Sequence, residues 1–251
     1  MSTARPSAPR PLRPGSLRLL AAILLLPLLA APARADQRHF AWTYEAQTLA
    51  AGEAEIESYT TLSSAELGEA TGRTATNLQL ELEVGMTDRF DFGLYQVFDQ
   101  EPDQGLVYAG YKLRFRYRLG EPERRPFAAV AYLEYKGLPD YSRHAFEVKG
   151  IAARDFGSFR LALNPALEFE QEGSEWKMEP EYAAGAAWLS GDLLSLGLEV
   201  RGSEEAHYLG PVIGHGAGDL WVALGAAVRV SGDAATTAEV ETRLLVGFEI
   251  R

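Results

Sequence analysis

The chain has 251 residues, with 24 Lys and Arg against 35 Asp and Glu, for a formal net charge of −11. Binding to nucleic acid is driven by basic surface, so this acidic balance argues against a nucleic acid partner. Cysteine is absent, which excludes both a disulfide framework and a thiolate metal site.

Residues 1–35 have the features of a secretory signal peptide. They contain several arginines and no acidic residue, an apolar run from Leu19 to Ala31, and small residues at Ala33 and Ala35. The apolar run is too short for a typical membrane-spanning helix, and the small residues are those that a signal peptidase reads. We therefore expect an exported protein that is cleaved before Asp36.

From residue 52 onward, apolar and polar side chains alternate with a period of two, which is typical of β-strands. Gly, Asp, Asn, Pro and Ser separate the runs, and no helix-period segment interrupts them. An even number of strands places both termini at one end, as in bacterial single-chain barrels. The pattern predicts twelve strands: 54–62, 77–86, 90–98, 111–119, 127–136, 145–154, 159–170, 176–189, 194–201, 207–215, 219–230 and 239–251.

The fourth run is the most informative, because every second residue in it is basic. Successive strand side chains point to opposite faces, so the basic residues share one face and the apolar residues share the other. The basic face consists of Lys112, Arg114, Arg116 and Arg118, and the apolar face of Tyr111, Leu113, Phe115, Tyr117 and Leu119.

Twelve strands enclose more space than apolar side chains can fill, which argues against a soluble barrel with an apolar core. Turning the apolar faces outward to lipid removes this difficulty and leaves the charged faces around water. The sequence therefore predicts an all-β fold, a single transmembrane antiparallel up-and-down β-barrel of about 12 strands over residues 52–251. Residues 36–51 would form a periplasmic segment, a short extra strand or a plug within the barrel.

Charged side chains on the inner faces would line the lumen, and rings of charge set the selectivity of pores. An acidic excess on several strands favours cations over anions. The alternative is that these charges pair with one another and close the interior, which would make a structural or adhesive barrel. The predicted lumen-lining residues are Lys112, Arg114, Arg116, Arg118, Glu81, Glu83, Glu147 and Lys149.

Two segments carry a resemblance to known proteins. Residues 38–45 (RHFAWTYE), followed by 52–57 (GEAEIE), resemble a largely uncharacterised porin-like family of bacterial outer-membrane β-barrels. The resemblance implies residence in the outer membrane of a Gram-negative bacterium, contact with its lipid, and passive passage of small solutes or ions. It implies no cofactor and no covalent chemistry, and neither the solute nor the oligomeric state follows from the sequence.

An outer-membrane lipid hydrolase is the competing class, because some twelve-stranded barrels use a Ser and a His on their outer face. Ser142 and His144 are the candidates, but they occur in the reverse of the order expected for such a lipase. His207 and His215, near Glu204 and Glu205, could bind a metal on an outer loop, although isolated histidines there are more often solvated. We therefore expect neither an enzyme nor a metal site.

Overall fold

The computed structural model describes residues 37–69, 73–120, 127–191 and 193–250. All of these residues belong to one compact unit that spans residues 31–251. The predicted signal peptide, residues 1–35, lies outside the described residues. The described part of the chain includes no helix long and apolar enough to cross a membrane.

The described residues form twelve strands, which confirms the predicted fold class and strand number. A single 3₁₀ turn, η1 (Leu67–Glu69), follows the first strand. The strands are β1 (Ala54–Ser64), β2 (Ala75–Thr87), β3 (Phe90–Gln100), β4 (Val107–Arg118), β5 (Ala128–Gly137), β6 (His144–Phe156), β7 (Phe159–Glu172), β8 (Glu175–Ser190), β9 (Leu194–Gly202), β10 (Ala206–Ala217), β11 (Leu220–Gly232) and β12 (Val240–Ile250).

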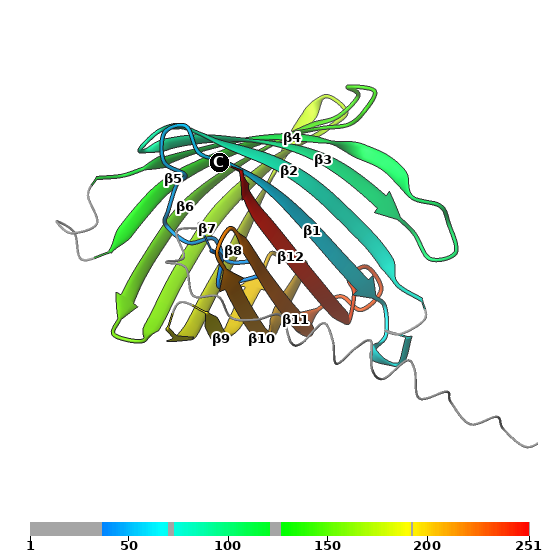
Figure 1. Ribbon diagram of the computed structural model, residues 1–251. Helices are drawn as coiled ribbons and strands as arrows, with labels where there is room; N and C mark the ends of the chain where they lie inside the picture. The colour runs from blue at the N-terminus through cyan, green and yellow to red at the C-terminus, as the bar shows by residue number, and fades with distance from the viewer. Residues whose placement is uncertain (1–36, 70–72, 121–126, 192, 251) are drawn as a thin grey trace, which may run out of the picture. The chain divides into compact units, whose positions relative to one another are not determined.

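The sheet closes into a barrel in which each strand pairs antiparallel with its sequence neighbours (Figure 1). The closing contact joins β1 to β12 in unbroken register, from the pair Ala54 and Ile250 to the pair Ser64 and Val240. Closure gives every strand two partners, so no strand presents the unpaired N–H and C=O groups of a sheet edge.

Strand β10 carries the weakest of the strand predictions, because its sequence is rich in Gly and contains Pro211. It forms a full strand and pairs with β9 without interruption from His207 to His215, Pro211 lying opposite Leu198. On its other side, the pairing with β11 skips Gly210 and Pro211. Proline has no N–H to donate, so this local gap lets the strand include it.

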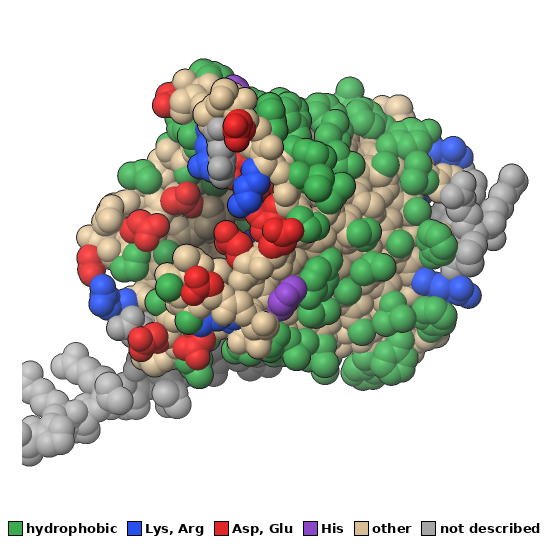
Figure 2. All heavy atoms as spheres, turned by 180° about the vertical axis from the view of Figure 1, so that it is seen from behind, with side chains coloured by type: hydrophobic (Ala, Val, Ile, Leu, Met, Phe, Trp, Pro, Cys, Tyr) green, Lys and Arg blue, Asp and Glu red, His purple; other side chains and the backbone are tan. Residues whose placement is uncertain are grey.

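The two faces of the wall differ as the alternation predicts. Leu80 and Leu224 face outward and are 43% and 44% exposed, whereas Arg114 faces inward and is 0% exposed. Hydrophobic side chains cover the outer wall, while acidic and basic side chains gather around a hollow at one end (Figure 2). Water would penalise such an apolar exterior, whereas the hydrocarbon of a bilayer requires it.

Aromatic side chains form clusters near both ends of the outer wall. At one end, the rings of Tyr135 and Phe146 lie 5.2 Å apart and those of Phe146 and Trp176 lie 5.9 Å apart. At the other, Phe156, Phe159 and Trp188 are cross-strand neighbours on β6, β7 and β8. This distribution is typical of the aromatic girdles that sit at the two membrane interfaces.

The two ends of the barrel differ in their connections. The described residues 65–69, 73–74, 101–106, 138–143 and 233–239 lie at one end, which we call the loop end, together with the shorter connections 173–174 and 203–205. Residues 88–89, 157–158 and 218–219 make short turns at the opposite end, which we call the turn end, where β1 begins and β12 finishes. In bacterial barrels the short turns are periplasmic and the longer loops are external.

A charge on the outer wall should destabilise the barrel in a bilayer according to its depth. We expect Leu82→Arg, at the middle of β2, to lower the free energy of unfolding by about 2–4 kcal/mol, because hydrocarbon does not solvate the guanidinium. Met86→Arg, near the turn end of the same strand, should cost only about 0–1 kcal/mol. Urea unfolding in lipid vesicles measures both, and equal losses would contradict the membrane depth assigned to β2.

Candidate functional site

The interior of the barrel is occupied at the turn end by the N-terminal segment, residues 37–53. Gln37 lies against Gly216 of β10, which places the start of this segment near the turn end. Trp42 lies deeper, with the Arg201 guanidinium 5.2 Å from its ring. The chain then returns, so that the Leu49 N–H donates to Asp91 (3.2 Å) and the Ala51 N–H to Asp88 (3.3 Å). The segment is thus a hairpin-shaped insert, which we call the plug, and contains no strand.

One carboxylate of the wall holds the tip of the plug. The backbone N–H groups of Ala41, Trp42 and Thr43 donate to Glu199 of β9, at 2.8, 2.9 and 2.7 Å. Glu199 is only 3% exposed, so these three N–H groups take the place of its lost hydration. Three donors converging on one buried carboxylate fix both the position and the direction of the plug backbone.

A side-chain amide holds the next residue of the plug. The Tyr44 N–H donates to Asn164 Oδ1 (2.5 Å), and Asn164 Nδ2 donates to the Tyr44 carbonyl (3.0 Å). Asn164 lies on β7 and faces inward, so it pairs with the backbone of the plug much as a neighbouring strand would. Because the plug is buried and has no strand pairing, its backbone N–H and C=O groups need other hydrogen-bond partners, and Asn164 and Glu199 supply them.

Glycines on the inner wall make room for the aromatic residues of the plug. A Cβ at Gly185 would lie 2.4 Å from the Phe40 ring, and a Cβ at Gly225 would lie 2.5 Å from the Trp42 ring. Neither distance is compatible with a side chain. The β8 and β11 sequences therefore fit the plug at these two points.

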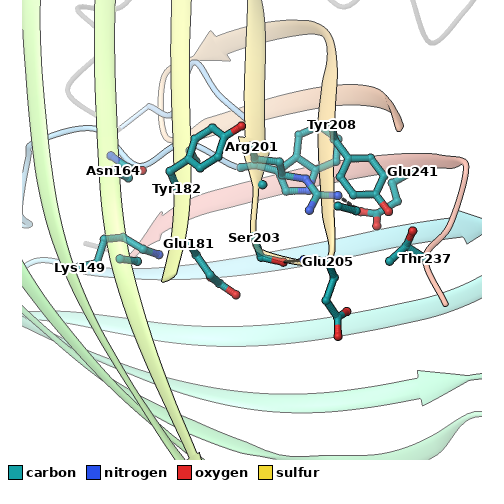
Figure 3. Close-up of a pocket in the computed structure, with 15 residues that line it drawn as sticks. Lys149, Asn164, Glu181, Tyr182, Arg201, Ser203, Glu205, Tyr208, Thr237 and Glu241 are labelled. Carbon is teal, nitrogen blue, oxygen red and sulfur yellow. Dashed lines mark hydrogen bonds and ion pairs between the residues drawn. The ribbon is translucent and has the colours of Figure 1, made fainter. Parts of the chain in front are cut away.

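A pocket of 310 Å³ is lined by Trp42 and by residues near the loop end of the strands. Figure 3 shows Arg201, Tyr208 and Glu241, which line it. Arg201 of β9 stacks on the Tyr208 ring, 4.2 Å from its centroid, and forms an ion pair with Glu241 of β12. Lys149, Glu181 and Glu205 also line this pocket, which we call the vestibule. It has charges of both signs, three carboxylates and two basic groups, so it suits a hydrated polar solute better than an apolar one.

A chain of alternating charges runs across β4, β5 and β6. Lys112 contacts Glu134 (3.4 Å), Lys136 lies between Glu134 (3.8 Å) and Glu147 (3.2 Å), and Lys149 contacts Glu147 (2.5 Å). Lys136 also contacts Glu168 of β7 (2.6 Å). Of the predicted lumen-lining residues, Lys112, Glu147 and Lys149 therefore lie in one network.

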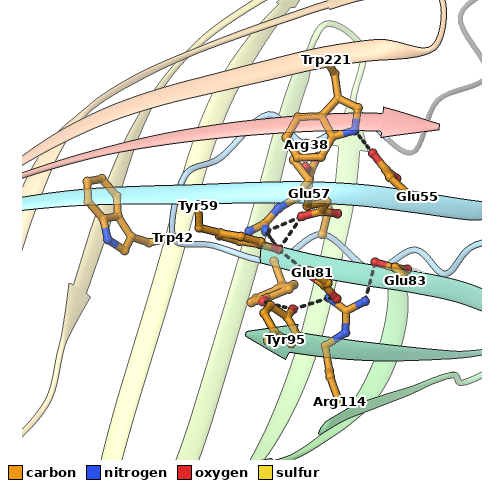
Figure 4. Close-up of polar contacts among 12 residues, drawn as sticks. Arg38, Trp42, Glu55, Glu57, Tyr59, Glu81, Glu83, Tyr95, Arg114 and Trp221 are labelled. Atoms are coloured by element: carbon orange, nitrogen blue, oxygen red, sulfur yellow. Dashed lines mark hydrogen bonds and ion pairs between the residues drawn. The ribbon is translucent and has the colours of Figure 1, made fainter. Parts of the chain in front are cut away.

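The central arginines of β4, Arg114 and Arg116, join a second network with β2 and β3. Figure 4 shows Arg114 with Glu81, Glu83 and Tyr95. Arg114 contacts Glu81 (2.9 Å) and Glu83 and donates to the Tyr95 hydroxyl (2.8 Å). Arg116, 4% exposed, contacts Glu83 and donates to Asp91 through Nε (2.9 Å) and Nη2 (2.7 Å). The two arginines therefore belong to a packed ionic interior and not to an open water-filled wall.

Arg38 of the plug extends this second network. Its guanidinium donates to the Tyr59 hydroxyl (3.1 Å), lies 3.9 Å from Glu57, and sits 4.3 Å from the centroid of the Tyr44 ring. The Tyr59 hydroxyl in turn lies 2.9 Å from Glu81. Burial alone would lower the pKa of Arg38, but the surrounding Tyr59, Tyr44 and Glu57 raise it above its usual value. The plug thus supplies a permanent positive charge to an acidic part of the wall.

The fourth basic residue of the predicted set, Arg118, lies apart from these networks. It is at the turn end of β4 and donates to the Asp88 carbonyl (2.5 Å). The functional residues absent from the prediction include Asp91 and Tyr95, which the alternation of β3 places on the inner face, so the period-two pattern could have identified them. The same alternation places Glu199 on the inner face of β9, but its role as an anchor, like the role of Arg38, depends on where the plug lies.

The residues considered for a hydrolase site or a metal site contact other side chains. The Ser142 hydroxyl donates to Asp140 (2.7 Å), and His144 Nδ1 lies 2.6 Å from the Tyr135 hydroxyl. His207 and His215 lie within β10 and not on an outer loop, and His207 Nδ1 is 3.0 Å from the Tyr182 hydroxyl.

Two carboxylate triads in the described residues have oxygens close enough to hold a metal ion, Glu57 with Glu81 and Glu83, and Glu147 with Glu168 and Glu181. Arg114 already pairs with the first triad, and Lys136 with the second. These side-chain cations compensate the carboxylates in the same way that a metal ion would.

No family profile and no curated protein sequence matches the chain. Among solved structures, an outer membrane channel from Pseudomonas putida F1 is similar, with a TM-score of 0.57 and 10% identity over 82% of this chain and 98% of that one. A bacterial polysaccharide outer membrane secretin gives a TM-score of 0.43 at 12% identity over 79% and 98% of the two chains. LpxR from Salmonella typhimurium gives 0.41 at 10% identity over 78% and 99%. The first likeness shows that this chain has the fold of outer-membrane β-barrels, and the two lower scores add nothing to that conclusion.

Removing the cation at the centre of the second network should be costly. Arg114→Met leaves Glu81 buried without its cation and Glu83 with Arg116 alone, so we expect the free energy of unfolding to fall by about 3–5 kcal/mol. Arg118→Met, on the same strand at the exposed turn end, should change it by no more than about 0.5 kcal/mol. Urea unfolding in vesicles compares the two, and similar losses would contradict the central role of Arg114.

Acid should loosen the plug through His39. Burial lowers the pKa of His39 below the usual 6.5, with Glu45 offsetting part of the effect. His39 therefore binds a proton more readily when the plug is released than when it is docked. Docking of the plug is at full strength above pH 6.5, the usual pKa, and weakens as the pH falls through the lowered pKa of the docked state. The introduced thiol of Thr43→Cys, unique in a chain without cysteine, should react faster with a thiol reagent at low pH. The same rate ratio in a His39→Gln background would contradict the assignment to His39.

Proposed function

We propose that the protein resides in the outer membrane of a Gram-negative bacterium and forms a gated channel for small solutes and ions, with the plug as its gate. The observation that carries the proposal is the attachment of the plug. Its tip is held by hydrogen bonds from three backbone N–H groups to Glu199, and its next residue by Asn164. Polar contacts of this kind exchange readily with water, whereas an apolar seal would not.

The charges of the vestibule support a preference for cations. Glu181, Glu205 and Glu241 face it, against Lys149 and Arg201, and Arg201 is paired with Glu241. A local excess of carboxylate raises the concentration of cations at a pore mouth and repels anions. The solutes that the vestibule suits are therefore small, polar and neutral or positively charged, and the proposal assigns the protein no covalent chemistry.

The experiment is planar-bilayer recording of the refolded full chain and of a Glu199→Gln variant. An amide oxygen accepts more weakly than a carboxylate, and a bond to a charged group contributes about 1.5–3 kcal/mol, so the open state should be populated at least roughly tenfold more often. Glu53→Gln is the matched control, because its carboxylate accepts from the exposed Ala50 N–H (3.0 Å) outside the tip. We expect it to behave like the unmodified chain.

The result also decides between the channel and a closed structural barrel, which the dense ionic interior favours. Current steps that increase in Glu199→Gln, with a reversal potential that favours cations in a salt gradient, support the gated channel. The absence of current in both the unmodified chain and Glu199→Gln would overturn it and leave the closed barrel.

A further inference from the structure

The outer wall is hollowed where β8 carries alanines between the leucines of its neighbours. Ala184 lies opposite Leu163 of β7 and Val200 of β9, and Ala186 lies opposite Leu161 and Leu198 in the same way. The larger side chains of β7 and β9 therefore project further outward than the alanine methyl groups of β8, which form the floor of the hollow. The hollow encloses 610 Å³ and extends across to β6 and β10.

The outward-facing side chains of this hollow are apolar, with one exception. Arg154 of β6 lies opposite Leu161, and its guanidinium is 4.8 Å from the centroid of the Phe156 ring. Within the strands that the structure describes, Arg154 is the only Asp, Glu, Lys or Arg whose place in the alternation points to lipid. The other outward-facing members are Phe127, Ala152, Phe156, Leu161, Leu163, Ala184, Ala186, Leu198, Val200 and Leu209.

The position of Arg154 determines what can neutralise it. It lies two residues from the turn end of β6, next to the aromatic cluster of Phe156, Phe159 and Trp188. This is the level of the lipid headgroups, where aromatic girdles sit and where a long basic side chain can reach an anion. A charge that faces lipid is costly unless it is paired, and the anion that lipid offers at this level is a phosphate.

We propose that the hollow and Arg154 together form a binding site for one phospholipid molecule. The lipid phosphate binds the Arg154 guanidinium, and one acyl chain lies along the alanine floor of β8 between the leucines of β7 and β9. A bound chain fills a space that bulk lipid would fill only transiently, and the guanidinium fixes its headgroup. The two features are adjacent on the wall, so a single lipid satisfies both.

The test is native mass spectrometry of the delipidated full chain in detergent, titrated with dioleoyl phosphatidylglycerol. We expect one saturable lipid per chain. Dioleoylglycerol, which has the same acyl chains without the phosphate, should bind roughly tenfold more weakly, since a charge-assisted hydrogen bond of ordinary strength corresponds to about that factor.

Two pairs of variants separate the headgroup contact from the groove. Arg154→Gln should weaken binding about tenfold, whereas Arg154→Lys, which keeps the charge, should retain most of it. Ala184→Leu should fill the floor and also weaken binding. Ala226→Leu is its matched control, because Ala226 faces outward on β11, away from the hollow. The heat-dependent gel mobility of the barrel shows which variants fold, and if Arg154→Gln does not, the alanine pair decides.

Equal affinity of the unmodified chain and Arg154→Gln would overturn the site, as would equal losses in Ala184→Leu and Ala226→Leu. A dimer of the unmodified chain that Ala184→Leu disrupts, without retained lipid, would also overturn it and assign the hollow to a second copy of the chain. None of these outcomes depends on whether the barrel conducts ions.

Discussion

The orientation of the strand faces is the constraint from which the rest of the structure follows. Once the apolar faces point to lipid, each charged side chain of the wall must be accommodated inside. Water alone does not do this, since Arg114, Glu55 and Glu83 are almost completely buried. A buried charge without a partner would destabilise the fold by several kcal/mol. The interior is therefore built as ion pairs across strands, and the pairing of β2, β3 and β4 through Arg114 and Arg116 is its most compact part.

The plug belongs to this same balance of charge. The inner wall buries more carboxylates than cations, and Glu57 and Glu199 have partners that come from the plug. Arg38 contributes a guanidinium to Glu57, and the backbone at the plug tip contributes N–H groups to Glu199. Movement of the plug would thus expose two wall carboxylates, and it would also withdraw Glu45 of the plug from Arg160 of β7, with which it forms an ion pair (2.8 Å). The position of the plug and the pairing of charges inside the barrel are consequently coupled.

The sequence was sufficient to predict the strands and the face on which each strand residue lies, because apolar and polar residues alternate with a period of two. The twelve strands, the outward leucines and the inward position of Arg114 follow from that single rule. The choice of ion-pair partners does not, since it depends on register and on side chains that reach past a neighbouring strand. Arg114 thus contacts Glu81 two strands away, whereas Glu147 joins Lys136, a residue outside the predicted set. The plug was least predictable, since its anchor Glu199 is more than 150 residues away in sequence.

The way in which the plug is held is consistent with a gate and would be a poor design for a permanent seal. Its tip has two aromatic residues, Phe40 and Trp42, which fit against Gly185 and Gly225 and give it a defined seat. Three of its backbone N–H contacts converge on one carboxylate, Glu199, so these three form or break together. A few bonds to a charged group, each contributing about 1.5–3 kcal/mol net of exchange with water, give a docking energy that a change of charge can offset. The plug also packs Phe40, Ala41 and Trp42 into the main apolar cluster of the interior. A seal made of such apolar packing alone would lack a single control point, and the gate proposed above depends on the contacts that converge on Glu199.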